Sequence, residues 1–333
     1  MAALLLFMFG ATGTEANSKS GTVDNPKQIP DSIVITSNRF PTPIEKDASS
    51  VTIITEEEIE KSPTVMVSEL LKQVAGIDVV RSGGLGTQTS VFMRGTNSNH
   101  TLVLIDGVEM NNPSSPTTSF DFGSLNVSNI QRIEILRGPQ SVLYGSDAVG
   151  GVIQIFTKRG FGNLQADIIS EAGAYKTYTE SINLSGSQGK GDYSLFVSRK
   201  NSDGFSTIRQ DAGGDEKDGF ESSDIITNVG IQVIKDYDLT FNGRITDADA
   251  DIDQSYGVLD DPNYTSENKM KSFMIRFKNH NSNSIYFQPD VSVSLFNQDI
   301  KTINKEDDAH VGESSEFNSN GKRLKISASN FMN

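Results

Sequence analysis

The fold of this chain is decided by one stretch, IQRIEILRGPQSVLYGSDAVGGVIQIFTKRG, which covers residues 130–160. Two runs rich in β-branched residues, Gln131–Leu136 and Gly151–Thr157, predict short strands. The segment between them is rich in glycine, which permits tight turns and close approach of backbones where a Cβ atom would clash. The glycines concerned are Gly138, Gly145, Gly150 and Gly151.

Residues 44–160 as a whole predict a compact α+β unit. Thr55 and Glu58 have the spacing of a capping box, so a short helix is expected to begin there, after a strand at Val51–Ile54. Ser62 and Pro63 suit the N-cap and first position of a second helix, which Gly76 would end. Its apolar face would be Met66, Leu70, Leu71 and Val74. Further short strands are expected at Ile77–Arg81, Ser90–Arg94 and Thr101–Ile105.

After about residue 162 the pattern changes to long segments in which apolar and polar residues alternate with a period of two. Some joins between these segments are tight, whereas residues 201–222 and 247–267 predict long acidic loops. Short turns on one side and long loops on the other favour an antiparallel transmembrane β-barrel, although a soluble β-sandwich would also alternate. About eight strands are expected, near residues 163–174, 176–187, 191–201, 223–235, 237–248, 267–280, 283–298 and 321–331.

Composition excludes several classes of function. The 333 residues carry a net charge of −14, which argues against nucleic-acid binding because phosphate contacts need clustered Lys and Arg. There is no cysteine, and the three histidines (His100, His280 and His310) show no metal-ligand spacing along the sequence. No nucleophile–base pair is recognisable, so we expect no enzyme; a soluble enzyme on a β-scaffold is the weaker alternative. No apolar run reaches the ~20 residues of a membrane-spanning helix.

The N-terminal region predicts export. Residues 1–16 combine a short apolar run with small residues, as in a secretory signal, although the basic start is missing; a frayed apolar tail is the alternative. Residues 17–43 predict a polar linker. Within it, Ile33–Thr36 form a β-prone patch that could pair with a strand of another protein, or be an ordinary edge strand of the next domain.

Three ordered motifs carry a resemblance to a known family: SELLKQVAGIDVV (68–80), VFMRGTNSNHTLVLIDGVEMN (91–111) and the stretch 130–160. Together they resemble the plug of TonB-dependent outer-membrane receptors, and they are most similar to the cobalamin branch of that family. The resemblance implies a signal-like segment (1–16), a periplasmic linker with a TonB box (17–43), a plug (44–160) and an N-terminal part of the barrel (161–333). It also implies a location in the outer membrane of a Gram-negative envelope.

The resemblance implies partners and roles for particular residues. TonB, with ExbB and ExbD behind it, would bind a box made of Asp31, Ile33, Val34, Ile35 and Thr36. Arg94 and Arg137 would pair with acidic groups on the barrel wall, or form ion pairs inside the plug. The receptor would be a monomer in outer-membrane lipid.

Ligand contact is expected from two plug loops, whose glycine, serine and proline residues could also be only turns. The candidates are Ser82, Leu85, Gln88, Asn111, Asn112, Ser114 and Ser115. A cobalamin-like chelate is the preferred ligand. The alternative ligands are a ferric siderophore or haem, and another chelate or a sugar. An alternative function is a binding-only plug module without transport, although the strands after residue 162 argue against it.

The acidic loops predict calcium as the one candidate cofactor, because Ca²⁺ takes six to eight oxygen ligands. Solvated acidic loops are the alternative. The candidate ligands are Asp215, Glu216, Asp218, Asp253, Asp260 and Asp261. Because receptors of this kind close about 22 strands around the plug, eight strands would make only part of a barrel, and we expect a fragment.

Overall fold

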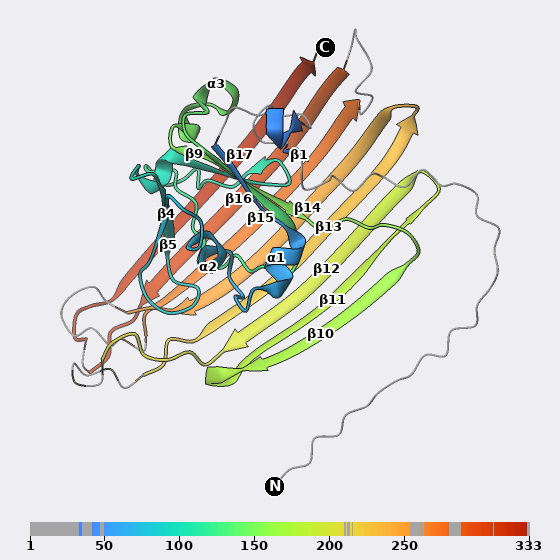
Figure 1. Cartoon of the computed structure of the whole chain (residues 1–333). Coiled ribbons are helices and arrows are strands. Elements are labelled where there is room, and N and C mark those ends of the chain that lie inside the picture. The colour runs from blue at the N-terminus through green and yellow to red at the C-terminus, as the bar shows by residue number, and fades with distance from the viewer. Residues whose placement is uncertain are drawn as a thin grey trace, which may run out of the picture.

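The computed structural model describes residues 33–34, 42–46, 50–209, 211, 214, 216–253, 261, 263–279, 288–308 and 310–331. They form two layers: a plug, and a curved antiparallel sheet against one face of which the plug lies (Figure 1). The described helices are all too short or too polar to cross a membrane.

The plug is built on a five-stranded sheet of order β3-β8-β9-β6-β7. Its strands are β3 (Ser50–Ile54), β6 (Thr101–Ile105), β7 (Val108–Glu109), β8 (Ile130–Arg137) and β9 (Gly151–Thr157). Two smaller pairs accompany it: β1 (Ile33–Val34) with β2 (Thr42–Pro43), and β4 (Ile77–Arg81) with β5 (Thr89–Met93). The helices are α1 (Glu56–Lys61), α2 (Val67–Leu71) and α3 (Ser141–Tyr144), with 3-10 turns η1 (Ile44–Lys46), η2 (Ser98–His100) and η3 (Ser146–Ala148).

Helix α1 begins as the capping box predicts. Glu58 N donates to Thr55 Oγ1, and Thr55 N donates to the Glu58 carboxylate at 2.8 Å. The expected start of the second helix at Ser62 is wrong. Ser62 is instead the C-cap of α1, and its N–H donates to the Glu58 carbonyl at 3.1 Å. Met66 pairs with Asn126 in a β-bridge. This extended pairing competes with helix formation, so α2 begins only at Val67.

The second layer is an eight-stranded antiparallel meander, as predicted. Its strands are β10 (Gln165–Gly173), β11 (Thr177–Gln188), β12 (Gly191–Ser202), β13 (Phe220–Ile234), β14 (Tyr237–Asp251), β15 (Thr265–Asn279), β16 (Gln288–Asn304) and β17 (Ser315–Phe331), with η4 (Ala174–Lys176) after β10. The expected loop 247–267 is too long at both ends. Strand β14 extends to Asp251 and β15 begins at Thr265, so Asp247, Asp249 and Asp251 lie on a strand.

The two faces of the meander differ in chemistry. Along β12 and β13 buried and exposed positions alternate, as the period of two predicts. The exposed positions carry apolar rows that run across strands. One row joins Ile182, Val197, Ile225 and Ile245.

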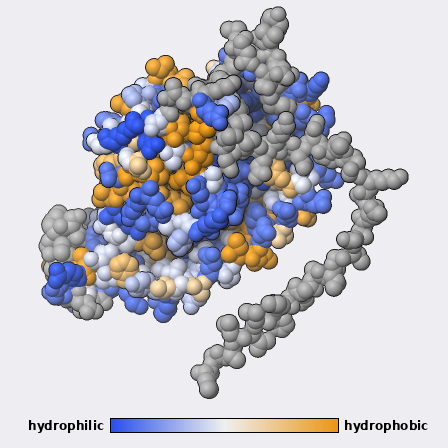
Figure 2. Space-filling model, in the orientation of Figure 1, coloured by the Kyte–Doolittle hydropathy of each residue, from blue (hydrophilic) through white to orange (hydrophobic). Residues whose placement is uncertain are grey.

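The core of the plug extends onto the opposite, inner face of the meander. Met270, Met274 and Phe296, from β15 and β16, are buried in the same apolar cluster as Ile133 and Ile153 of the plug. Burying these side chains removes apolar surface from water, which favours the docked position. Figure 2, seen from the plug side, shows hydrophobic residues gathered over the end of the plug that carries α3, where Val142, Leu143 and Val149 are exposed.

Candidate ligand-binding site

A cavity of about 1050 Å³ lies between two plug loops and the inner face of the meander. One loop, residues 82–88, is closed by Ser82 N donating to the Gln88 carbonyl at 3.0 Å. The other, residues 112–119, starts with an Asx turn in which Asn112 Oδ1 accepts from Ser114 N at 2.9 Å. The plug therefore supplies the floor of the cavity through two locally braced turns.

Five of the seven predicted ligand contacts line this cavity: Ser82, Gln88, Asn112, Ser114 and Ser115. Leu85 does not. It packs on Phe220, Ala248 and Ala250 of the meander and so anchors its loop to the wall.

Asn111 also departs from the prediction, because it is fully buried and braces the second loop. Its Oδ1 accepts from Val103 N at 2.8 Å, while its Nδ2 donates to the carbonyls of Thr101 and Thr118. Contact with a ligand would break these hydrogen bonds, whose loss in a buried site is costly.

The wall opposite the plug loops mixes aromatic and amide side chains, including Phe220, Asn268, Gln298 and Phe317. Gly86 lies so close to Phe220 that a Cβ atom on it would be 2.2 Å from the ring, and its φ is +78°. Only glycine fits there. The arrangement offers hydrogen-bond donors and acceptors beside flat apolar surface, which suits a large ligand of mixed polarity.

The carboxyl of Asp121, at the edge of the cavity, links the plug backbone at Thr89 to the backbone at Gly123. Its Oδ1 accepts from Thr89 N and Gly123 N, each at 2.8 Å. Burial raises the pKa of Asp121 to about 6, against the lowering effect of these two hydrogen bonds.

The predicted acidic ligands fall into two groups rather than one. Glu216, Asp218 and Asp253 come together with carboxylate oxygens within 4.8 Å of one another. Thr207 bridges them, since its N–H donates to Asp218 and its hydroxyl to Asp253. Asp215 and Asp260 lie outside the described residues.

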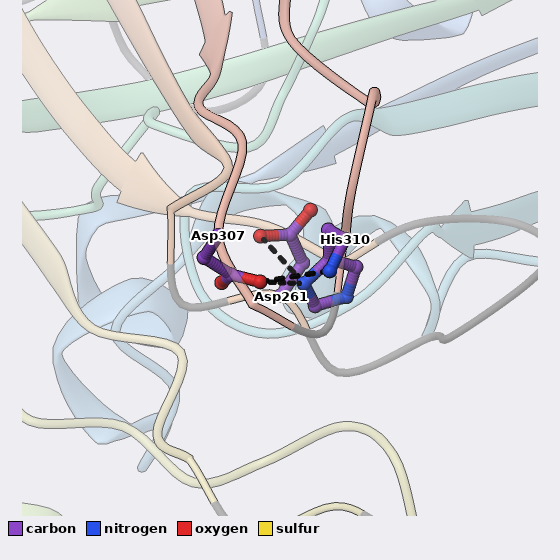
Figure 3. Close-up of side chains that lie close together, drawn as sticks. All are labelled: Asp261, Asp307 and His310. Carbon is purple, nitrogen blue, oxygen red and sulfur yellow. Dashed lines mark hydrogen bonds and ion pairs between the residues drawn. The ribbon is translucent and has the colours of Figure 1, made fainter.

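Asp261 belongs to the second group, with Asp307 and His310, and the three side chains converge from two loops (Figure 3). Inspection of sequence spacing missed this group, because Asp261 is far from the other two along the chain. The pKa of His310 is raised: burial lowers it, but the hydrogen bond to Asp307 and the charges of Asp261, Asp307 and Glu313 outweigh burial.

The two arginines predicted to reach the barrel wall make contacts inside the plug. Arg137 donates to the Ala75 carbonyl at 2.6 Å and to Thr52 Oγ1 at 2.7 Å. Arg94 has an exposed side chain and a positive φ of 50°, and its N–H donates to the Gly76 carbonyl. A contact of either arginine with the wall stays a prediction.

Other residues, which sequence reasoning missed, hold the plug to the meander. Arg159 forms a bidentate pair with Asp192, in which Nε donates to Oδ1 at 3.0 Å and Nη2 to Oδ2 at 2.8 Å, and Lys325 contacts Glu109 at 2.8 Å. A third joint is buried: Asp224 accepts from Asn126 of the plug and from Arg244 of β14. Alternation along the strands places Asp192, Asp224 and Arg244 on the inner face, but no local signal gives their partners.

The predicted TonB box is only partly described. Its residues Ile33 and Val34 form β1, paired antiparallel with Pro43 and Thr42, and Val34 is fully buried. Asp31, Ile35 and Thr36 lie outside the described residues.

Comparison with known proteins identifies what the two layers are similar to. A family model for the TonB-dependent receptor plug domain matches residues 43–152. The vitamin B12 transporter BtuB of Photobacterium profundum is 35% identical over 241 residues, which cover 72% of this chain and 39% of that protein. The matched part of the chain thus spans well under half the length of this curated relative.

Solved structures share the fold at low identity. The siderophore receptor PirA of Acinetobacter baumannii aligns with a TM-score of 0.66 and 17% identity, over 86% of this chain and 45% of that one. The ferric yersiniabactin uptake receptor FyuA of Yersinia pestis aligns with a TM-score of 0.66 and 17% identity, over 86% and 46%. These likenesses support the two-layer arrangement of plug and antiparallel strands.

Proposed function

This chain belongs to the TonB-dependent receptor family, with the plug and an N-terminal part of the barrel, and we propose that it is part of an outer-membrane receptor. This receptor would take up a large, scarce chelate, with a cobalamin as the preferred ligand. The observation that carries the proposal is the cavity of about 1050 Å³ between the plug loops and the meander. Its volume lies just above the usual range of ligand pockets, which is roughly 300 to 1,000 Å³.

The exposed apolar rows support a position in the outer membrane. Side chains such as Val197, Ile225 and Val293 face outward, where a soluble protein would carry polar groups. A contiguous apolar surface of this kind is typical of contact with lipid.

The choice of cobalamin rests on the 35% identical relative, which is described as a vitamin B12 transporter. A ferric siderophore or haem is the second candidate, favoured by the siderophore receptors among the structures of similar fold. Both kinds of ligand present a broad, partly apolar body with polar rim groups, which matches the mixed walls of the cavity.

Calcium would strengthen the ligand-side loops if it occupies the group Glu216, Asp218 and Asp253. Their oxygens lie within 4.8 Å of one another, and Asp218 and Asp253 also line the cavity. A hard cation with oxygen ligands suits three carboxylates. Bound there, it would tie the loop after β12 to the end of β14.

Binding of labelled cyanocobalamin to the full chain in detergent micelles tests the proposal. We expect saturable binding that is stronger with Ca²⁺ than with EGTA. Ser115→Trp, which fills the cavity from the plug loop, is expected to weaken binding at least tenfold, or ~1.4 kcal/mol. The control Ser141→Trp, on exposed α3 outside the cavity, should leave binding unchanged.

Saturable binding of a ferric siderophore without cobalamin binding would move the assignment to the second candidate. If neither ligand binds, or if Ser115→Trp and Ser141→Trp behave alike, the cavity is not the receptor site. Loss of the difference between Ca²⁺ and EGTA in Asp253→Asn would support the calcium assignment, and an unchanged difference would oppose it.

Energy coupling would use the patch Ile33–Thr36. We propose that it leaves its pairing with Thr42–Pro43 and adds as a strand to TonB. Val34→Pro removes a backbone donor and is expected to abolish crosslinking to TonB. Normal crosslinking of that variant would rule out strand addition at this position.

A further inference from the structure

His310, Asp307 and Asp261 form a compact group of metal-ligand type beside the cavity. Asp261 comes from the connection between β14 and β15, whereas Asp307 and His310 come from the connection between β16 and β17. His310 Nδ1 lies 2.8 Å from Asp307 Oδ1 and 3.9 Å from Asp261 Oδ1 (Figure 3). His310 and Asp261 are each 1% exposed.

Both carboxylates are oriented by neighbouring amides. Asn304 Nδ2 donates to Asp261 Oδ2 at 2.8 Å, and Asn263 Nδ2 donates to Asp307 Oδ2 at 2.7 Å. The Oδ1 atom of each carboxylate is thereby directed to the same imidazole nitrogen. Orientation of ligating side chains by outer hydrogen bonds is a regular feature of metal sites.

A proton on the imidazole accounts for only part of this geometry. Nδ1–H can donate to Asp307, but 3.9 Å to Asp261 is beyond hydrogen-bond distance. Asp261 Oδ1 also accepts from Asn263 N at 3.2 Å, and Asp307 Oδ1 also accepts from His310 N at 2.8 Å. Within the described part of the chain, two buried polar atoms, Nε2 of His310 and Oδ1 of the neighbouring Asn304, make no hydrogen bond.

We propose that His310, Asp307 and Asp261 bind a divalent first-row transition metal of the Zn²⁺ class. Imidazole nitrogen with carboxylate oxygen is a zinc donor set, whereas Ca²⁺ takes oxygen alone. With bonds of ~2.0–2.1 Å, tetrahedral geometry separates ligand atoms by about 3.3 Å. The observed 2.8 and 3.9 Å bracket that value, and all three ligand atoms lie within 4.8 Å of one another.

The metal would tie two loops together at the border of the cavity. Tyr264, Asn304 and Glu313, which flank the three ligands in sequence, all line the cavity. Metal binding therefore fixes one side of the ligand site. This site is distinct from the group Glu216, Asp218 and Asp253, which contains no nitrogen ligand.

Co²⁺ and Zn²⁺ titrations of the full chain in detergent micelles test the site. We expect one equivalent of Co²⁺ to give the intense visible bands of four-coordinate cobalt, which Zn²⁺ then displaces. His310→Ala and Asp261→Asn are each expected to weaken Zn²⁺ binding at least about tenfold. The matched control is Asp167→Asn, at an exposed position of β10, which should bind Zn²⁺ normally.

A second readout follows the loop rather than the metal. Lys305 is exposed in the connection between β16 and β17, and trypsin cleavage after it should slow when Zn²⁺ is added. His310→Ala should remove this protection. The comparison is valid only if circular dichroism shows that the variant keeps its strands. Asp307→Asn provides the same comparison if His310→Ala does not fold.

Absence of saturable Zn²⁺ binding would overturn the proposal and leave His310 as a side chain that joins the two loops by hydrogen bonding to Asp307. Equal Zn²⁺ binding by the parent, His310→Ala and Asp261→Asn would also overturn it. Zinc-dependent protection of Lys305 that survives in His310→Ala would place the metal elsewhere.

Discussion

Asp224→Ala is expected to destabilise β13 and β14 and to loosen the plug segment around Asn126 that rests on them. Asp224 is 1% exposed and accepts from Arg244 at 2.8 Å, from Thr246 Oγ1 at 2.7 Å and from Asn126 of the plug at 2.7 Å. Truncation leaves the buried guanidinium of Arg244 without its carboxylate. Breaking a buried ion pair in this way costs ~3–5 kcal/mol.

Hydrogen exchange on the full chain measures this effect locally. We expect faster exchange in the segment around Asn126 and in β13 and β14, with the five-stranded sheet of the plug still protected. Asp167→Ala, at an exposed position of β10, is the matched control and should change nothing. Exchange in Asp224→Ala that matches the parent would mean that the buried joint does not hold the plug.

Gly151→Ala is expected to disrupt the plug itself. Gly151 begins β9 at a φ of +154°, and a Cβ atom there would lie 2.3 Å from the Leu136 carbonyl oxygen and 2.2 Å from Met93 Sδ. Methionine can move, but the carbonyl belongs to β8, which pairs with β9. Backbone strain and a clash with fixed backbone together should cost at least ~3 kcal/mol.

The measurement is urea unfolding followed by circular dichroism, with exchange at residues 130–157 as the local readout. Gly173→Ala is the control, because Gly173 has extended backbone and its added Cβ would meet only Thr177 at an ordinary 3.6 Å. We expect it to unfold like the parent. A Gly151→Ala variant as stable as Gly173→Ala would show that the β8–β9 contact is not tight.

Regular alternation made the meander predictable from sequence. Strand β12 was expected at 191–201 and occupies Gly191–Ser202, because each of its residues faces either the plug or the outside. The capping box of Thr55 was likewise a local signal and is confirmed. Both are features that neighbouring residues determine by themselves.

Features that depend on distant partners were not predictable in this way. The Ser62 helix start was wrong because Met66 pairs with Asn126, sixty positions later. Glu109 meets Lys325 only because the plug docks on the meander. His310 meets Asp261 only because the strand pairing of the meander brings their two connections together. The cavity loops were identified by resemblance, but Asn111 proved to be a brace because its buried neighbours offered three backbone partners.

The central claim is that the plug loops and the inner face of the meander together line one cavity. Ser114 Oγ of the plug and Ser319 Oγ of β17 are 2.5 Å apart at its edge, and the chain has no cysteine. Oxidation of the variant that carries Ser114→Cys and Ser319→Cys in outer-membrane preparations is therefore the most direct measurement. We predict a rapid intramolecular disulfide, absent from either single variant, whereas a double variant that stays reduced would contradict the docked arrangement.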